Sequence, residues 1–289
     1  MSSGDAHCFD DAMMDQMTTS ASAARTAVAW AEAEGWNPGL DDAERFVAAD
    51  PDAFLAVERD GEIVATVSCA LYGATYAFLG FYVVRADMRG RGIGSALFDR
   101  ALVRAAGRIV GLDGVLAQQA SYERRGFALA YRNIRWRTAG GGRRPDGLVD
   151  LRSIPLEQLV AYDSAVFGTE RERFLRAWIG RPPGHALACT REGTLAGYGV
   201  LRRCRVGAKI GPLIADDEHA AEALLRGLLA AAGPEVHVFV DMPAANERAA
   251  LVRDGREMGE VFATARMYSN GRPPEDVGRV YAVTSLEFG

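Results

Sequence analysis

Residues 81–98 read FYVVRADMRGRGIGSALF, and this stretch decides the fold. Its first four residues are apolar, as in a buried strand, and an amphipathic helix is predicted from about Gly92 to Ala106. An arginine- and glycine-rich turn separates the two. Glycine lets a backbone approach a ligand closely, and the free N–H groups of a new helix attract a phosphate. The stretch therefore predicts a strand–loop–helix unit that binds an anion.

The loop differs from the two common phosphate-binding motifs. Its spacing is Arg89-x-x-Gly92-x-Gly94, which is neither the G-x-G-x-x-G of dinucleotide-binding folds nor the Gly-Lys-Ser/Thr of a P-loop. The string is weak by itself, because residues 137–142 repeat it in a segment that no predicted helix follows. A strand–helix turn without function is the alternative to an anion site.

Upstream of this turn, residues 63–84 carry no charge. The run could pass for a membrane span, but Tyr72-Gly73-Ala74-Thr75 interrupts it with turn chemistry. Both sides are rich in β-branched and aromatic residues, so we expect two buried strands, 63–71 and 75–84. Strand and helix signals alternate along the chain, which predicts an α/β (α+β) fold.

The second half of the chain repeats the pattern of the first. Gly61 and Gly193 lie in matching turns 132 residues apart, and Gly126 and Gly255 are 129 residues apart. This nearly constant offset predicts a duplicated fold of roughly 130 residues. Residues 138–147 contain four glycines, a proline and two arginines, so we expect a linker there between domains at 1–137 and 148–289.

The composition is that of a globular protein: 49% of the 289 residues are hydrophobic and 25% are charged. The net charge of −5 disfavours a nucleic-acid partner. Four cysteines without C-x-x-C spacing and four scattered histidines argue against a metal site and favour a reducing, cytoplasmic location. The first 17 residues, which include Cys8, lack the basic and apolar regions of a signal peptide.

Residues 10–137 resemble the GNAT superfamily of N-acyltransferases. The Arg89-x-x-Gly92-x-Gly94 loop between strand and helix looks like the family's acetyl-CoA pyrophosphate loop. Residues 117–127, AQQASYERRGF, resemble its helix ending in Tyr-x-x-x-Gly-Phe, and residues 34–39, EGWNPG, look like a segment of bacterial tandem members. The second half is similar only in outline.

The resemblance implies two GNAT-like domains, each with a mixed, mostly antiparallel sheet flanked by helices. The first domain would bind acetyl-CoA and do the chemistry, and a degenerate second domain would complete the substrate cleft. In the second half, residues 214–219, IADDEH, stand in place of the glycine loop, and Leu251 stands in place of Tyr122. We therefore expect the second half not to bind acetyl-CoA.

The resemblance also implies roles for individual residues. Pantetheine would pair with the strand at Phe81, Val83 and Val84, and the N–H of Val83 or Val84 would polarise the thioester. Tyr122 would be the general acid, with core packing as its alternative role. The backbone N–H groups that would hold the pyrophosphate are those of Arg89, Gly90, Arg91, Gly92, Ile93, Gly94 and Ser95.

The general base is not assigned, because the strand before the loop carries no carboxylate. Asp113, Glu34 and Asp42 are candidates, and each also suits a capping or solvated position. Trp36 and Asn37 lie between the two N-terminal helices, where family members admit substrate. Together with Asp113, they are the candidate substrate contacts.

These inferences predict a cytoplasmic N-acetyltransferase that moves an acetyl group from acetyl-CoA directly to a primary amine. The resemblance implies neither a covalent enzyme intermediate nor a metal. The acceptor would be a small-molecule or peptide amine, and we expect no membrane or nucleic-acid partner. The oligomeric state is not indicated. The alternative function is a non-catalytic acyl-CoA-binding sensor, which would keep the loop but perform no turnover.

Overall fold

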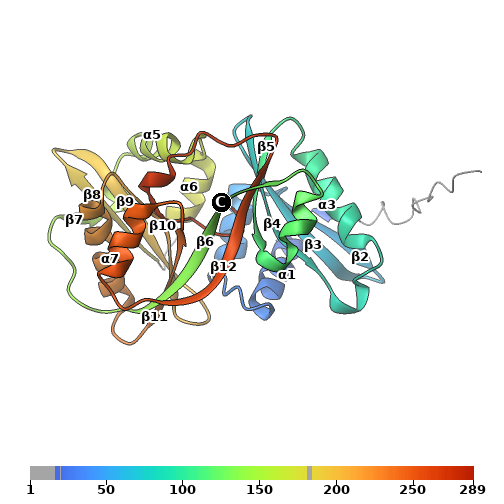
Figure 1. The fold of residues 1–289 in the computed structure, drawn as a ribbon, viewed down its shortest axis with the longest axis horizontal. Coiled ribbons are helices and arrows are strands. Elements are labelled where there is room, and N and C mark those ends of the chain that lie inside the picture. The colour runs from blue at the N-terminus through green and yellow to red at the C-terminus, as the bar shows by residue number, and fades with distance from the viewer. Residues whose placement is uncertain (1–16, 20, 181–183) are drawn as a thin grey trace, which may run out of the picture.

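The computed structural model describes residues 17–19, 21–180 and 184–289, so the acidic N-terminal stretch up to residue 16 lies outside it. The described strands form one continuous sheet of 13 strands. Neighbouring strands are antiparallel, except that β4–β5 and β10–β11 are parallel. Helices flank the sheet, and the predicted α/β fold with a mixed, mostly antiparallel sheet is confirmed (Figure 1). The strand order is β1-β2-β3-β4-β5-β12-β6-β11-β10-β9-β8-β7, with β13 paired to β10.

The first half contains the elements that the hydrophobic pattern predicts. The uncharged run at residues 63–84 forms the antiparallel pair β3–β4, as expected. None of the described helices is long and apolar enough to cross a membrane. The elements are β1 (Met17–Thr19), α1 (Ala21–Ala33), α2 (Asp42–Ala49), β2 (Phe54–Arg59), β3 (Glu62–Tyr72), β4 (Tyr76–Val84), α3 (Ile93–Arg104), β5 (Ile109–Val115), α4 (Gln119–Glu123) and β6 (Ala128–Ala139).

The second half repeats the order of the first, from the β2–β3 pair to β6. The corresponding elements run from the β8–β9 pair through β10, α7, β11 and α8 to β12. The elements are β7 (Leu148–Asp150), α5 (Leu156–Phe167), α6 (Glu172–Ile179), β8 (Gly184–Arg191), β9 (Thr194–Arg203), β10 (Ala208–Ala215), α7 (Glu218–Ala232), β11 (His237–Pro243), α8 (Glu247–Asp254), β12 (Gly259–Ser269) and β13 (Val280–Ala282).

The last long strand of each half is inserted beside the other half. β6 lies between β11 and β12, and β12 lies between β5 and β6, so β5 is paired by a strand of the second half. Figure 1 shows β6 and β12 side by side through the middle of the molecule. The expected linker also begins later than residue 138, because β6 continues to Ala139. The division into domains at residues 137 and 148 stays a prediction.

The helices pack on the two faces of this sheet and form three apolar cores. α3 packs on one face of the first half through Leu97 and Phe98, and α7 packs on the second half through Leu224 and Leu225. On the other face, α1 and α2 share one core with α5 and α6. Burying a large apolar side chain stabilises the folded state by about 1.5–3 kcal/mol, so this shared core stabilises the packing of the two halves against each other.

Candidate active site

The site is a gap in the sheet between β4 and β5. These strands pair in parallel as far as Leu79 and Leu112 and then separate. At this point β4 bulges, because its register on β3 shifts and Phe81 takes a φ of 47°. The Thr66 hydroxyl donates a 2.9 Å hydrogen bond to the Phe81 carbonyl and holds the bulge. Beyond Leu79, the backbone of β4 therefore has no strand partner on the side that faces β5.

A cavity of about 600 Å³ opens at the gap. Its lining brings together residues that were predicted from separate parts of the sequence, and two of the candidates, Asn37 and Asp42, are not on it. Their chemical roles stay predictions. The predicted residues on the lining are Glu34, Trp36, Phe81, Val83, Val84, Arg89, Gly90, Arg91, Gly92, Ile93, Gly94, Ser95, Asp113 and Tyr122.

The glycines of the loop have two different functions. Gly90 and Gly92 have φ angles of 76° and 80° with open space beside them, so glycine is needed there for its backbone conformation. At Gly94 a Cβ atom would lie 2.6 Å from the Tyr82 hydroxyl, so glycine is needed there for close packing of α3 on β4. No side chain in the described part of the chain caps the start of α3. Its first N–H groups are therefore available to an anion.

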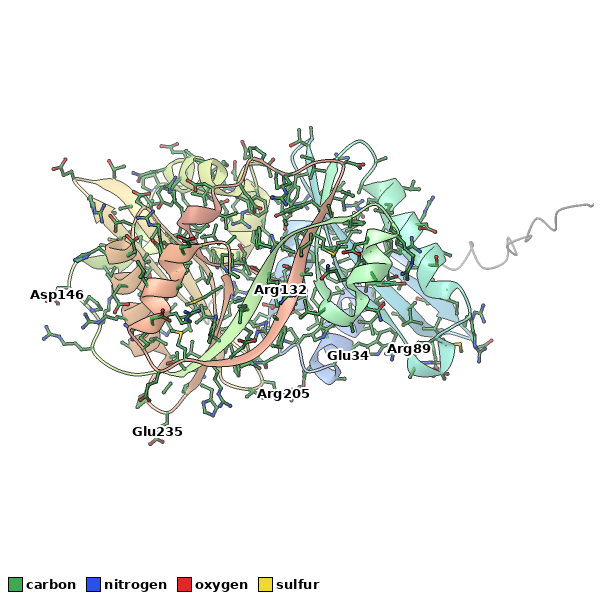
Figure 2. The ribbon with its side chains drawn as sticks, viewed as in Figure 1. Glu34, Arg89, Arg132, Asp146, Arg205 and Glu235 are labelled. Carbon is green, nitrogen blue, oxygen red and sulfur yellow. The ribbon has the colours of Figure 1, made fainter. Side chains whose placement is uncertain are left out.

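Three arginines line the cavity near the loop: Arg89, Arg91 and Arg125. The Arg89 side chain donates to the Val84 carbonyl at 2.9 Å and to Glu34 at 3.1 Å, and Figure 2 shows Glu34 and Arg89 close together. Arg125, which the sequence motifs did not single out, forms an ion pair with α3. Guanidinium groups bind phosphate oxygens well, so this end of the cavity suits a pyrophosphate.

The position of Tyr122 is compatible with both roles considered from the sequence, core packing and general acid. Its ring lies 5.9 Å from the Phe98 ring and 6.3 Å from the Phe127 ring, so it packs in the core. Its Cε2 atom also lies so close to Gly114 of β5 that a Cβ there would come within 2.6 Å of it. The residue nevertheless lines the cavity. Burial raises the pKa of the Tyr122 phenol to about 12, so the group is protonated at neutral pH.

Asp113 is held by other side chains. Its Oδ2 lies 2.6 Å from Nη2 of Arg266, and its Oδ1 accepts bonds from Arg266 Nε at 3.1 Å and from Asn133 Nδ2 at 2.8 Å. Burial raises the pKa of Asp113, although the Arg266 charge opposes the shift. Both oxygens are engaged within the protein, which favours a structural role over the base or substrate contact considered from the sequence.

The remaining candidates from the N-terminal helices separate in the structure. Trp36 lines the cavity, whereas the Asn37 side-chain amide bonds to both backbone groups of Val206, at 2.9 and 3.2 Å. These bonds join the segment after α1 to the β9–β10 turn, and the substrate contact expected at Asn37 stays a prediction. Asp42 is buried in an ion pair with Arg202 and also lies off the lining.

The second half contributes four cavity residues that sequence reasoning missed: Phe262, Thr264, Leu286 and Glu287. The first two belong to β12, which is inserted beside β5. The other two lie in the C-terminal segment. No local motif marks these residues, because the pairing of β12 with β5 and the path of the C-terminal segment bring them to the cavity.

The corresponding gap in the second half is filled. β13 pairs with β10 where β10 and β11 separate, and the Val283 N–H donates to the Asp241 carbonyl of β11 at 2.9 Å. At the start of α7, the Asp217 side chain accepts from the Ala220 N–H at 2.9 Å and so caps the helix. Leu251, in the position of Tyr122, is 67% exposed.

Comparison with known proteins identifies the family to which this fold belongs. A sequence model described as the acetyltransferase (GNAT) family matches residues 15–127, and one described as an acetyltransferase (GNAT) domain matches residues 159–282. The chain belongs to the GNAT acetyltransferase family, with two such domains in tandem, and is an acyltransferase.

Its relatives include proteins of similar length. A holothin acyltransferase of Pseudoalteromonas is 30% identical over 264 residues, which cover 90% of this chain and 89% of the relative. YitH, an uncharacterised N-acetyltransferase of Bacillus subtilis, is 24% identical over 271 residues, which cover 88% of this chain and 91% of the relative. A solved structure from Pyrococcus horikoshii, named as an acetyltransferase, shares the fold with a TM-score of 0.81 at 23% identity, covering 95% of this chain and 96% of the other.

Proposed function

We propose that the protein transfers the acetyl group of acetyl-CoA directly to a primary amine. The observation that carries the proposal is the open gap between β4 and β5, which has the glycine loop at one end and Tyr122 on its wall. An extended pantetheine arm can pair with the free backbone of β4 as an added strand would. The N–H groups of residues 89–95 would then hold the pyrophosphate.

The proposed chemistry uses two groups of the first half. Of the two candidate donors, the Val84 N–H faces the gap, because the pairing of β4 with β3 directs the N–H groups of Val83 and Arg85 at β3. The Val84 N–H would polarise the thioester carbonyl in place of Val83, and such a donor lowers a barrier by about 3 kcal/mol. The amine nitrogen forms a bond to the carbonyl carbon, the carbon–sulfur bond breaks, and Tyr122 gives its proton to the leaving thiolate. With its pKa raised to about 12 by burial, the Tyr122 phenol holds its proton at neutral pH and has one to give when the thiolate leaves.

The second half would wall the cleft and help to select the acceptor, a small-molecule or peptide amine. Phe262 and Leu286 support this, because they extend the cavity from the second half. The relative named as a holothin acyltransferase makes holothin one acceptor to test. The free cysteines at 69, 189 and 204 suit a reducing compartment, and we propose the cytoplasm as the location.

A mass-spectrometric screen of primary amines with acetyl-CoA tests the proposal. The panel contains holothin, alkylamines, arylalkylamines and peptides with a free N-terminus. We expect at least one amide product at an enzymatic rate with the full chain. A protein that binds acetyl-CoA in calorimetry but acetylates no amine would be the acyl-CoA sensor instead. Absence of acetyl-CoA binding would contradict both functions.

A further inference from the structure

The cavity contains a carboxylate that the proposed chemistry has not yet used. Among the described residues, the acidic side chains on its lining are those of Glu34, Asp113 and Glu287. Glu34 is paired with Arg89, and Asp113 is paired with Arg266. Glu287 is only 4% exposed and, within the described residues, has no arginine or lysine at ion-pair distance. Of the three carboxylates, that of Glu287 is therefore the one that can form an ion pair with a cationic ligand.

Three cations lie near Glu287, and two of them are paired with other carboxylates. Arg135, Arg202 and Lys209 lie close enough for the Glu287 charge to affect their pKa values. Arg135 is bound at two points by Asp241, and Arg202 is paired with Asp42. The Lys209 ammonium donates to the Trp36 carbonyl at 3.4 Å.

The carboxylate itself has one hydrogen-bond partner in the described structure. The Ser285 hydroxyl donates to Oε2 of Glu287, and its oxygen accepts from the Glu287 N–H at 3.0 Å. Oε1 is left without a partner among the described residues. A cationic acceptor group in the cavity would supply that partner.

The C-terminal segment holds Glu287 in place from both sides. Upstream, β13 is fixed in the gap of the second half. Downstream, the Phe288 ring stacks on Phe46 with centroids 3.9 Å apart, and the Tyr72 hydroxyl donates to the Phe288 carbonyl at 2.7 Å. The Glu287 carbonyl lies so close to Gly80 that a Cβ there would be 2.0 Å from it. The segment thus crosses β4 at the bulge, and the C-terminus lies near the middle of the molecule (Figure 1).

We propose that Glu287 binds the ammonium group of the acceptor and is the general base of the reaction. This inference rests on the proposed N-acetyltransferase function. A primary amine is mostly protonated at neutral pH and must lose a proton before its nitrogen can attack. Glu287 takes that proton and releases it to water, then takes a second proton from the nitrogen as the carbon–sulfur bond breaks and releases this one to water as well. Tyr122 protonates the thiolate and is reprotonated by water, so each turnover yields the amide, coenzyme A and one proton.

Two aromatic side chains on the lining indicate a suitable probe for this carboxylate. Trp36 and Phe262 line the same cavity as Glu287. A cavity that offers aromatic side chains and a carboxylate suits an ammonium group on a flat apolar body. The probe is 2-phenylethylamine, or the best primary amine of the screen if that is turned over faster.

The test compares this amine with hydroxylamine, a nucleophile that is mainly unprotonated at neutral pH. In the Glu287→Gln variant we expect kcat/KM for the amine to fall by about 10²-fold or more, the scale of a positioned general base. For hydroxylamine we expect a loss of less than about tenfold, because no proton has to leave before attack. Glu287→Asp, which keeps a carboxylate, should recover part of the amine activity.

The controls separate the base from a structural charge. Glu260→Gln replaces an exposed carboxylate on β12 outside the cavity and should leave both reactions unchanged. Acetyl-CoA affinity and the unfolding temperature of Glu287→Gln show whether the site is intact. Equal losses with both nucleophiles, or amine turnover within twofold of the wild type, would overturn the role of Glu287. A wild-type protein that acetylates no amine would instead contradict the proposed function.

Discussion

Asp113 of β5 and Arg266 of β12 form a two-point ion pair, with 2.6 Å between Oδ2 and Nη2 and 3.1 Å between Oδ1 and Nε. Both side chains are buried. The pair joins a strand of the first half to a strand of the second half at the edge of the cavity. It therefore holds the inserted strand β12, and with it Phe262 and Thr264, against the first half.

We predict that breaking this pair destabilises the whole chain. Arg266→Met leaves Asp113 buried without its cation, which costs about 3–5 kcal/mol in the free energy of unfolding. Adding Asp113→Asn should recover part of that loss, because no buried charge then remains. Urea denaturation measures all variants. The exposed pair Arg143–Asp146 supplies the control, since Arg143→Met should not change stability measurably. Additive effects of the two buried substitutions would contradict the coupling.

The glycine loop should be the binding site for acetyl-CoA. Gly92→Asp places a side chain and a negative charge at the start of α3, so calorimetry should show binding weakened at least tenfold, about 1.4 kcal/mol. Gly61→Asp is the matched control. Gly61 has a φ of 77° with open space around it, so the backbone strain is similar, but it lies in a turn outside the cavity. Unchanged affinity in a folded Gly92→Asp protein would remove the loop from the binding site.

The hydroxyl of Tyr122 should act only when the thiolate leaves. Tyr122→Phe keeps the ring against Phe98 and Phe127, so we expect little change in stability or in acetyl-CoA affinity. The value of kcat should fall roughly 10²-fold, as expected when a positioned general acid is lost. Steady-state kinetics under conditions where chemistry limits the rate provide the measurement. A kcat within twofold of the wild type would leave Tyr122 with a packing role alone.

The pH profile should reflect the buried phenol. The general acid must be protonated, and the pKa of Tyr122 is raised by burial to about 12. Activity that depends on its protonated form is therefore present below that pH and is lost only as the pH rises through it. We expect kcat at saturating substrates to show no fall from phenol ionisation up to about pH 10. A basic limb near the ordinary tyrosine pKa of about 10, shifted by substitutions beside Tyr122, would contradict this assignment.

The full chain should bind one acetyl-CoA. In the second half β13 occupies the space between β10 and β11, and the carboxylate of Asp217 caps α7 where a phosphate would have to bind. Calorimetric titration should give one site per chain, and Gly92→Asp should weaken that site without revealing another. A second site that survives Gly92→Asp would show that both halves bind the co-substrate.

Local sequence was enough to predict much of the first half. The strand, loop and helix at residues 81–98 depend on hydrophobic period and on glycines at positive φ, which act over a few residues. The interruption at residues 72–75 likewise distinguished the β3–β4 pair from a membrane span. The repeat offset predicted two domains of one fold, because a duplicated pattern of elements survives when side chains diverge.

The elements, the repeated fold and the strand–loop–helix unit of the first half can thus be inferred from local sequence. The pairing of β12 with β5, the filling of the second gap by β13 and the position of Glu287 on the first gap become visible only in the folded chain. Strands pair through backbone groups that are the same in every strand, so a hydrophobic pattern does not specify the neighbour. A carboxylate near the C-terminus reaches the cavity through that long-range pairing, and no spacing within the sequence records it.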